Sequence, residues 1–264
     1  MSRAFPFFQG LHAPLHICHR GGAGLYPENT LFAFRQAVEV HRTDMLELDV
    51  HASRDGVVVV AHDPTLDRCT NAKGPLKDLT AAELAKVDAA FGTSYRGQGH
   101  GIPTLEAVLT AFPTMRLNVE LKVIDALGPF VDLVKRLGCL PRLCIGSEHD
   151  AIAEEIAKAL PDALLFFPAN ALAAFVLPTR AGEPPDDDRR YTVLDMPLVW
   201  EGVKLFDADL ARVAATHGKW VNIWTVDDPA DMKQAIADGV GGIMTDRPDV
   251  LRQVLDQLAS THSR

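Results

Sequence analysis

The sequence has few cysteines, and its four cysteines form no Cys-x-x-Cys pair. A zinc knuckle or a thioredoxin-like redox motif needs closely spaced cysteines, so the spacing argues against both. Cys18 adjoins His19, but neighbours on a strand point to opposite faces, which argues against a thiol nucleophile activated by that histidine. We expect reduced thiols, with Cys144 as a small core residue inside an apolar run.

Long apolar runs and an excess of basic residues are also missing. No stretch approaches the roughly 18 apolar residues of a membrane span, and the start of the chain lacks the apolar core of a signal peptide. The net charge is −9, whereas non-specific nucleic-acid binding needs a basic surface. An anionic small substrate stays possible where a metal and a few cations reverse the local field. We therefore expect a cytoplasmic protein that binds no nucleic acid and has no stable membrane insertion.

A Gly-x-Gly-x-x-Gly dinucleotide fingerprint after an early strand is absent as well. What is present is an alternation of strand-like and helix-like segments, which indicates a parallel sheet covered by helices. About eight such units predict an α/β fold, namely a TIM (β/α)8 barrel that forms a single domain over residues 1–264. A doubly wound open sheet is the alternative. The expected strands are 15–19, 45–51, 57–61, 117–123, 142–147, 163–167, 192–196, 220–226 and 242–245.

Capping residues indicate where the helices begin and end. Thr80 and Glu83 have the spacing of a capping box, and Ser147 to Asp150 resembles another. Asn29 is the expected cap of the first long helix, and Gly138 is the expected end of another. The predicted helices cover residues 30–40, 104–112, 127–137, 207–216 and 229–239, with one more ending near 160 and a terminal one from 248.

Two regions interrupt this alternation. Residues 63–103 are too long for a plain connection and are predicted to form a small insertion over the barrel mouth. Residues 181–190 contain Pro184-Pro185 and a run of three aspartates, and we expect an exposed loop with solvated charges.

Two strand-like stretches carry charged residues where a buried strand should be apolar. Side chains alternate along a strand, so Glu47 and Asp49 share one face, and Glu120 and Lys122 share a face of the second strand. Such groups are costly to bury unless they are paired or hold a metal. These residues lie late in their strands, as do His19 and Trp224, and active sites of TIM barrels occupy the carboxyl ends of the strands.

A hairpin turn at Asp55-Gly56 brings a second histidine toward these acids. If the strands pair so that residue numbers sum to about 111, His62 lies opposite Asp49. A shift of one residue in this register would place a different residue opposite Asp49. His51 lies on the face of Asp49, and we expect it to support the site rather than to bind a metal.

The three acids, Glu47, Asp49 and Glu120, repel each other unless a divalent cation lies among them, and oxygen ligands favour Mg²⁺ or Ca²⁺ over zinc. Such an ion polarises a phosphoryl oxygen. Two histidines can accept and donate protons near neutral pH. The cations that would bind phosphate oxygens are Arg20 and Lys122. The pattern therefore predicts a metal-assisted hydrolytic site.

In these features the chain resembles the glycerophosphodiester phosphodiesterase family. The resemblance extends from residue 19 to residue 248 and follows the family's order. The matching segments are His19-Arg20-Gly21-Gly22, Pro27-Glu28-Asn29-Thr30, Glu47-Leu48-Asp49-Val50, Asp55-Gly56, His62-Asp63, Pro103-Thr104-Leu105-Glu106, Glu120-Leu121-Lys122, Trp224-Thr225 and Thr245-Asp246-Arg247-Pro248.

The resemblance implies hydrolysis of a glycerophosphodiester to sn-glycerol 3-phosphate and an alcohol such as choline. It implies a TIM barrel with an insertion after the strand that precedes His62. The family's general acid and base match His19 and His62, and its phosphate contacts match Arg20 and Lys122. Its pocket aromatic matches Trp224. Its divalent metal, Mg²⁺ or Ca²⁺, would bind the ligands Glu47, Asp49 and Glu120.

One residue departs from the family pattern, and three other functions remain as alternatives. Glu148 follows Ser147 where family members often have an aromatic, which leaves the apolar wall of the pocket undefined. A lysophospholipase D or sphingomyelinase D-like relative would need an acyl groove, and no basic amphipathic helix is evident. A non-catalytic glycerophosphate-binding barrel would not need both histidines. A Schiff-base enzyme using Lys122 conflicts with the neighbouring Glu120.

Overall fold

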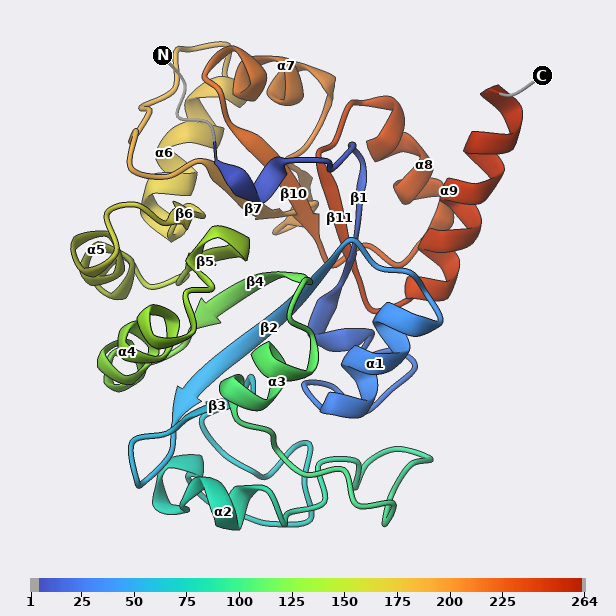
Figure 1. Ribbon diagram of the computed structural model, residues 1–264. Helices are drawn as coiled ribbons and strands as arrows, with labels where there is room; N and C mark the ends of the chain where they lie inside the picture. The colour runs from blue at the N-terminus through green and yellow to red at the C-terminus, as the bar shows by residue number, and fades with distance from the viewer. Residues whose placement is uncertain (1–4, 263–264) are drawn as a thin grey trace.

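The computed structural model describes residues 5–262, and within this range eight parallel strands form a barrel surrounded by helices (Figure 1). The strands follow the order β6-β5-β4-β2-β1-β11-β10-β7, and a parallel bridge between Phe166 and Val193 joins its two ends. This confirms the predicted TIM barrel and contradicts an open doubly wound sheet. The strands are β1 (Leu15–Cys18), β2 (Met45–Ala52), β4 (Arg116–Leu121), β5 (Leu143–Gly146), β6 (Leu164–Leu165), β7 (Val193–Pro197), β10 (Trp220–Trp224) and β11 (Gly242–Thr245).

A helix follows each barrel strand before the next one begins. Apolar side chains of the strands that face away from the barrel axis pack against these helices, as the main cluster of buried residues shows. The helices are α1 (Leu31–Glu39), α3 (Leu105–Ala111), α4 (Leu127–Leu137), α5 (Asp150–Ala159), α6 (Ala169–Arg180), α7 (Ala208–Thr216), α8 (Pro229–Ala237) and α9 (Pro248–His262). Short 3-10 turns are η1 (Pro6–Phe8), η2 (His19–Gly21), η3 (Leu76–Asp78), η4 (Ile124–Ala126) and η5 (Leu140–Arg142).

Two helix ends lie at the capping residues predicted from the sequence, and a third does not. The Thr80 hydroxyl accepts a hydrogen bond from the Glu83 backbone, and the Glu83 side chain bonds back to the Thr80 backbone, so the predicted capping box is confirmed at α2 (Ala81–Leu84). Gly138, with φ 60°, ends α4 in the left-handed conformation. The first long helix is capped by Thr30, whose hydroxyl accepts from Ala33, so the prediction of Asn29 as its cap was wrong.

The capping box predicted from Ser147 to Asp150 was also wrong. Helix α5 begins after His149, which makes no side-chain capping bond, and the Ser147 hydroxyl accepts from the His149 backbone instead. The aspartate run in the loop after α6 is less solvated than expected. Asp187 pairs with Lys219 at 2.5 Å and with His217 at 3.2 Å.

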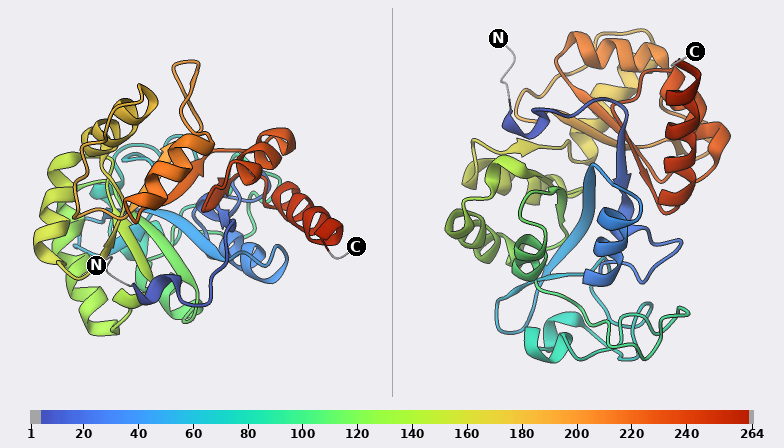
Figure 2. Two further views of the ribbon diagram at one scale, coloured as in Figure 1. Left: turned by 90° about the horizontal axis from the view of Figure 1, so that it is seen from above. Right: turned by 45° about the vertical axis from the view of Figure 1, so that its right-hand side comes forward.

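Residues 63–103 lie outside the barrel wall, as a layer at the lower edge of Figure 1 and of the right view of Figure 2. They contain η3 and α2, and their apolar side chains join a separate buried cluster with Val59 of β3 (Val58–Val60). We propose that the chain is one barrel domain carrying this insertion. The predicted domain ends, residues 1 and 264, lie outside the described residues. Within residues 5–262, no helix is long and apolar enough to cross a membrane.

A buried histidine in β1 makes the stability of the fold pH-dependent. His16 is fully buried, and its Nε2 donates to the Pro248 carbonyl at 2.9 Å. Burial lowers the pKa of His16 from 6.5 to about 4, so folding favours the neutral ring. This stabilisation is complete above pH 6.5 and is lost as the pH falls toward 4. The loss amounts to about 3 kcal/mol of unfolding free energy.

We expect His16→Gln to flatten this pH dependence. Urea unfolding of both proteins at pH 7 and pH 4 measures it, and the wild type should lose about 3 kcal/mol more than the variant. The variant is expected to be the less stable protein at pH 7, because a flexible amide replaces a packed ring. Equal losses in the two proteins would show that His16 does not carry the effect.

Candidate active site

A cavity of about 480 Å³ opens at the carboxyl ends of the barrel strands. Side chains from β2, β4, β7, β10 and β11 reach it, together with η2 after β1 and the segment that follows β3. Every site residue predicted from the sequence lines this cavity. They are His19, Arg20, Glu47, Asp49, His62, Glu120, Lys122 and Trp224.

Parallel pairing of β2 with β4 brings the acidic side chains together. In this register Asp49 lies opposite Glu120, and Glu47 precedes Asp49 on the same face of β2. Glu47 and Asp49 are only 7% and 2% exposed. The alternating side chains Leu46 and Leu48 are fully buried in the main apolar cluster. The strand periodicity thus directs apolar residues outward to the helices and carboxylates inward.

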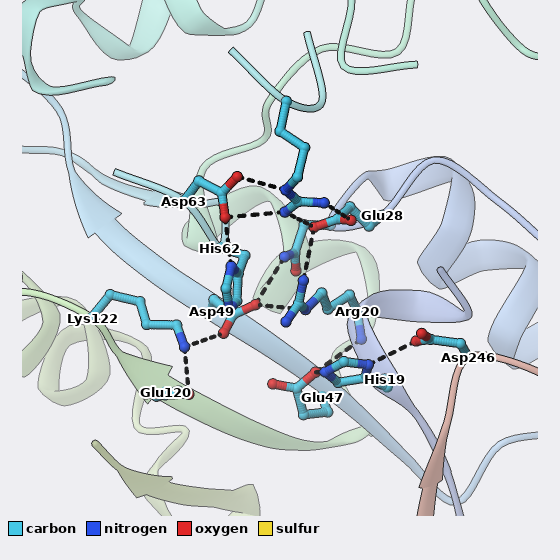
Figure 3. A network of polar contacts seen from close by, with 12 residues as sticks. His19, Arg20, Glu28, Glu47, Asp49, His62, Asp63, Glu120, Lys122 and Asp246 are labelled. Carbon is cyan, nitrogen blue, oxygen red and sulfur yellow. Dashed lines mark hydrogen bonds and ion pairs between the residues drawn. The ribbon is translucent and has the colours of Figure 1, made fainter. Parts of the chain in front are cut away.

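The turn after β1 adds a cation to this acidic cluster. Arg20 has φ 50°, and its backbone N–H donates to Glu47 Oε2 at 2.9 Å (Figure 3). The guanidinium lies 3.4 Å from Asp49 Oδ2, measured from Nε. Gly22 at the end of the turn has φ 95°, and a Cβ there would lie 2.9 Å from the Pro248 ring. The turn therefore requires glycine at this position.

A second cation lies between two of the acids. The ammonium of Lys122 is 3.1 Å from Asp49 Oδ1 and 2.8 Å from Glu120 Oε2 (Figure 3). The side-chain amide of Asn29 donates to the other Asp49 oxygen at 3.0 Å, and this left-handed residue with φ 57° belongs to the site rather than to the cap of α1. Burial lowers the pKa of Lys122, but Asp49 and Glu120 outweigh it and raise the pKa above its ordinary value.

Glu47 and Glu120 are the two acids of the cluster whose pKa values are raised. Burial, with added repulsion from Asp49, raises the pKa of Glu47 to about 8. Burial also raises the pKa of Glu120 to about 7, although Lys122 opposes the change. Both shifts show that neighbouring positive groups only partly offset the cost of burying these two carboxylates in their ionised form.

Each of the two predicted catalytic histidines is held by a carboxylate. His19 donates through Nδ1 to Asp246 Oδ1 at 2.7 Å, and its Nε2 lies 3.9 Å from Glu47 Oε2. Burial would lower the pKa of His19, but Glu47 and Asp246 together raise it above the ordinary value. His62 donates through Nδ1 to Asp63 Oδ1 at 2.7 Å. In both rings Nε2 is thus the nitrogen free to exchange protons with a substrate.

An arginine of the insertion connects the two halves of the site. Arg68 donates to Asp63 at 2.6 Å and 3.1 Å, and to Glu28 at 2.7 Å and 2.9 Å. Glu28 in turn accepts from Arg20 at 3.2 Å. The hydrogen bond from Arg68 lowers the pKa of Asp63 to about 2, so Asp63 stays ionised beside His62. Arg68 was not identified from the sequence, because a lone arginine in an irregular segment gives no signal.

The path by which His62 reaches the cavity differs from the prediction. Strands β2 and β3 pair with residue numbers that sum to 110, as in Val50 opposite Val60. Ala61, whose N–H donates to the Asp49 carbonyl, therefore takes the place predicted for His62, and the predicted register was wrong by one residue. His62 lies one residue beyond, where the chain leaves the sheet. His51 donates to the His62 carbonyl at 3.0 Å, which fits the supporting role expected for it.

The three carboxylates supply the oxygen ligands that a hard divalent cation prefers, and burial makes two of them, Glu47 and Glu120, costly to ionise without such a cation. Among residues 5–262, however, no three His, Cys, Asp or Glu side chains converge in the arrangement of a metal site. The Lys122 ammonium lies between Asp49 and Glu120 instead. Binding of a divalent ion by all three acids therefore requires Lys122 to move away from at least one of them.

Comparisons with known proteins agree with one another. The sequence model of the glycerophosphoryl diester phosphodiesterase family matches residues 19–250. Human lysophospholipase D GDPD1 is 31% identical over 93% of this chain and 87% of its own length. The probable glycerophosphodiester phosphodiesterase 2 of Mycobacterium tuberculosis is 32% identical over 90% of this chain and 89% of its own. A solved Oleispira antarctica phosphodiesterase, in complex with the product sn-glycerol-3-phosphate, shares the fold with a TM-score of 0.72 at 24% identity, covering 91% of this chain and 96% of that one.

Proposed function

Because the chain belongs to the glycerophosphoryl diester phosphodiesterase family and is an enzyme of that class, we propose that it hydrolyses glycerophosphodiesters to sn-glycerol 3-phosphate and an alcohol with the help of a divalent metal. One observation carries this proposal. Two histidines, each oriented by a carboxylate, line the same cavity as a buried acid cluster and two cations. Such a cavity offers proton transfer and phosphate binding in one place.

In the proposed reaction the two imidazoles act on opposite sides of the phosphorus. One of them, His19 or His62, accepts at Nε2 the proton of the substrate's 2-hydroxyl as that oxygen attacks phosphorus. The other donates its Nε2 proton to the departing alcohol oxygen, which leaves a cyclic phosphate. Water then opens the ring with the two roles reversed. Asp246 and Asp63 hold the rings so that Nε2 faces the cavity.

The other residues bind and orient the substrate. Arg20 and Lys122 contact non-bridging phosphate oxygens, and Trp224 packs against the glycerol. The ligands of the metal, Mg²⁺ or Ca²⁺, are Glu47, Asp49 and Glu120. When bound, such an ion would polarise a phosphoryl oxygen as a Lewis acid.

A chelation and add-back experiment tests this function. Purified protein is assayed for release of sn-glycerol 3-phosphate from glycerophosphocholine, after EDTA treatment and after return of Mg²⁺ or Ca²⁺. We expect turnover that EDTA abolishes and one of the two ions restores. A protein that binds glycerophosphocholine without cleaving it under any of these conditions would be the non-catalytic barrel. Full turnover in EDTA would remove the metal from the proposal.

A further inference from the structure

Three polar side chains meet inside the barrel, one layer deeper than the charged residues of the site. We call Asn118 of β4, Asp195 of β7 and Asn222 of β10 the polar floor, and they are only 2%, 9% and 1% exposed. The Asn118 side-chain amide donates to Asp195 Oδ2 at 2.5 Å, and the Asn222 amide donates to Asp195 Oδ1 at 2.7 Å. Strands β5 and β6 lie between β4 and β7, so the first of these bonds crosses the barrel interior.

The surrounding residues hold the donors of the polar floor in place. Asn222 Oδ1 accepts from Trp220 Nε1 at 2.9 Å, which fixes the amide so that its nitrogen faces Asp195. Gly242 pairs with Asn222 on the neighbouring strand, and a Cβ at Gly242 would collide with Asn222 Oδ1. Glycine is therefore required beside this amide. The carboxylate of Asp195 is thus held by donors whose positions the fold itself determines.

A carboxylate is a costly side chain at this depth. Interior layers of TIM barrels are ordinarily filled by apolar side chains, and Val193, which precedes Asp195 on the inward face of β7, belongs to such an apolar cluster. Burial raises the pKa of Asp195 to about 6, although the two amides oppose the change. Stability alone would favour an apolar residue here. The cost indicates that the carboxylate serves to bind a ligand.

The carboxylate retains acceptor capacity, and it borders the cavity. Asp195 and Asn118 both line the active-site cavity. An ionised carboxylate accepts up to about four hydrogen bonds, and among the described residues the two amides of the polar floor supply one to each oxygen. With a pKa of about 6 the group is ionised at pH 8, so it accepts hydrogen bonds and donates none. A hydrogen-bond donor of the substrate can therefore bind to it.

Strand register places this acceptor next to the position proposed for glycerol. Trp224 pairs with Pro197, and Asn222 pairs with Asp195, so Asp195 lies two residues deeper than the tryptophan that packs against glycerol in the proposed complex. Two residues span about 6.6 Å along a strand. In the proposed reaction the 2-hydroxyl of glycerol faces phosphorus. The free 1-hydroxyl is then the glycerol donor that can point into the barrel.

We propose that Asp195 determines specificity for glycerol by accepting a hydrogen bond from the 1-hydroxyl of the bound substrate. Asn118 and Asn222 are positioning residues that hold the carboxylate for this contact. The inference rests on the proposed function and names the residue that recognises the glycerol end of the substrate. A substrate without the 1-hydroxyl leaves a buried charged acceptor short of a partner, which costs more than losing an exposed contact.

The first test compares glycerophosphocholine with its 1-deoxy analogue. In the analogue a methyl group replaces the 1-hydroxymethyl group, and the attacking 2-hydroxyl is retained. A hydrogen bond to a charged group contributes about tenfold or more. We therefore expect kcat/KM of the metal-loaded wild type at pH 8 to be at least about tenfold higher for glycerophosphocholine. Equal values for the two substrates would overturn the inference.

Variants assign this preference to the carboxylate. Asp195→Asn removes the charge, Asp195→Ser removes the reach of the side chain, and thermal unfolding shows whether each variant is folded. The ratio of kcat/KM between the two substrates should fall at least about threefold in Asp195→Asn and approach one in Asp195→Ser, mainly through KM for glycerophosphocholine. Asp209→Asn, whose side chain is 83% exposed on α7, should keep the wild-type ratio. A merely structural role would lower kcat/KM equally for both substrates, and that unchanged ratio would overturn the inference.

A second pair of substrates tests the departing alcohol as the partner of Asp195. Glycerophosphoethanolamine carries N–H donors on its alcohol, whereas glycerophosphocholine carries none there. The Asp195 variants should therefore keep the wild-type preference between these two substrates. A preference that changes in the variants would show that Asp195 faces the departing alcohol, and it would overturn the assignment to the 1-hydroxyl.

A crystal structure of the wild type with sn-glycerol 3-phosphate requires neither a variant nor turnover. We expect the 1-hydroxyl oxygen to lie within about 3.2 Å of an Asp195 oxygen. A 1-hydroxyl directed away from the polar floor would overturn the inference. Failure to cleave any glycerophosphodiester would instead contradict the proposed function, and the position of the 1-hydroxyl in this complex would still decide the role of Asp195.

Discussion

Replacing His19 or His62 with alanine is expected to lower kcat for glycerophosphocholine by about 10²–10⁴-fold, because each substitution removes one proton-transfer group. Both rings line the cavity, and their Nδ1 atoms are engaged by Asp246 and Asp63 at 2.7 Å. KM should change far less than kcat, since the phosphate-binding cations remain in place. Steady-state kinetics on the metal-loaded enzyme measure both constants. Wild-type kcat in either variant would show that the ring is not the acid or base.

A matched control separates chemistry from general damage. His12 is exposed and does not line the cavity, so His12→Ala should keep wild-type kinetics and stability. A double variant lacking both His19 and His62 should lose no more than about tenfold beyond the worse single variant, because the two groups act in one concerted transfer. Fully multiplicative losses would instead indicate that the histidines act in separate steps.

The carboxylates behind the histidines should show a smaller and different effect. Asp246→Asn keeps the size of the side chain but lets the amide accept or donate, so the tautomer of His19 is no longer fixed. Since Asp246 and Glu47 raise the pKa of His19, the variant should also shift the His19-dependent limb of the kcat pH profile to lower pH. A purely structural role for Asp246 would lower stability without moving that limb.

The sequence predicted the parts of the site that are encoded locally. Alternation along β2 places Glu47 and Asp49 on one face, and no distant part of the chain is needed for that inference. The bounds of α4 are also encoded locally. The helix begins at Leu127 and ends at Leu137 before Gly138, as predicted. Where a short motif fixes the backbone by itself, residue type was sufficient.

Contacts between distant segments were not predictable in this way. The pairing of His19 with Asp246 joins positions 227 residues apart, and periodicity carries no information about such partners. The hairpin register failed for a related reason. A turn signal at Asp55-Gly56 locates the reversal but leaves one residue of freedom, which the packing of β3 removes.

Part of the cavity lining was missed because two of its elements lack the expected sequence patterns. Helix α6 is apolar on several sides, so it shows no amphipathic period. The hairpin of β8 (Val199–Trp200) and β9 (Val203–Lys204) turns at Glu201-Gly202 rather than at Asn-Gly or Asp-Gly, the strongest signals of a tight hairpin. Both elements are therefore ordered without a sequence signature, and their place at the cavity is evident only from the structure.

Removing a proposed metal ligand should have opposite effects on stability with and without the ion. For the wild type, Mg²⁺ or Ca²⁺ at about 100 times its Kd should add about 2.7 kcal/mol to the unfolding free energy, which corresponds to a Tm increase of roughly 5–8 °C for a chain of this size. In Glu47→Gln and Glu120→Gln this increase should fall below about 2 °C, since the ion loses a charged ligand. Differential scanning fluorimetry on EDTA-treated protein with added ion measures it.

Without metal the same variants should be at least as stable as the wild type. Burial and the charge of Asp49 raise the pKa of Glu47 to about 8, so the folded protein bears a cost for ionising this carboxyl that a neutral amide avoids. The amide oxygen can still accept the Arg20 N–H that now bonds to Glu47. Glu154→Gln, on the exposed face of α5, should change neither value. Equal stabilisation of the wild type and both variants by the ion would place the metal elsewhere, whereas stabilisation confined to the wild type would identify the acid cluster as the binding site of the cation.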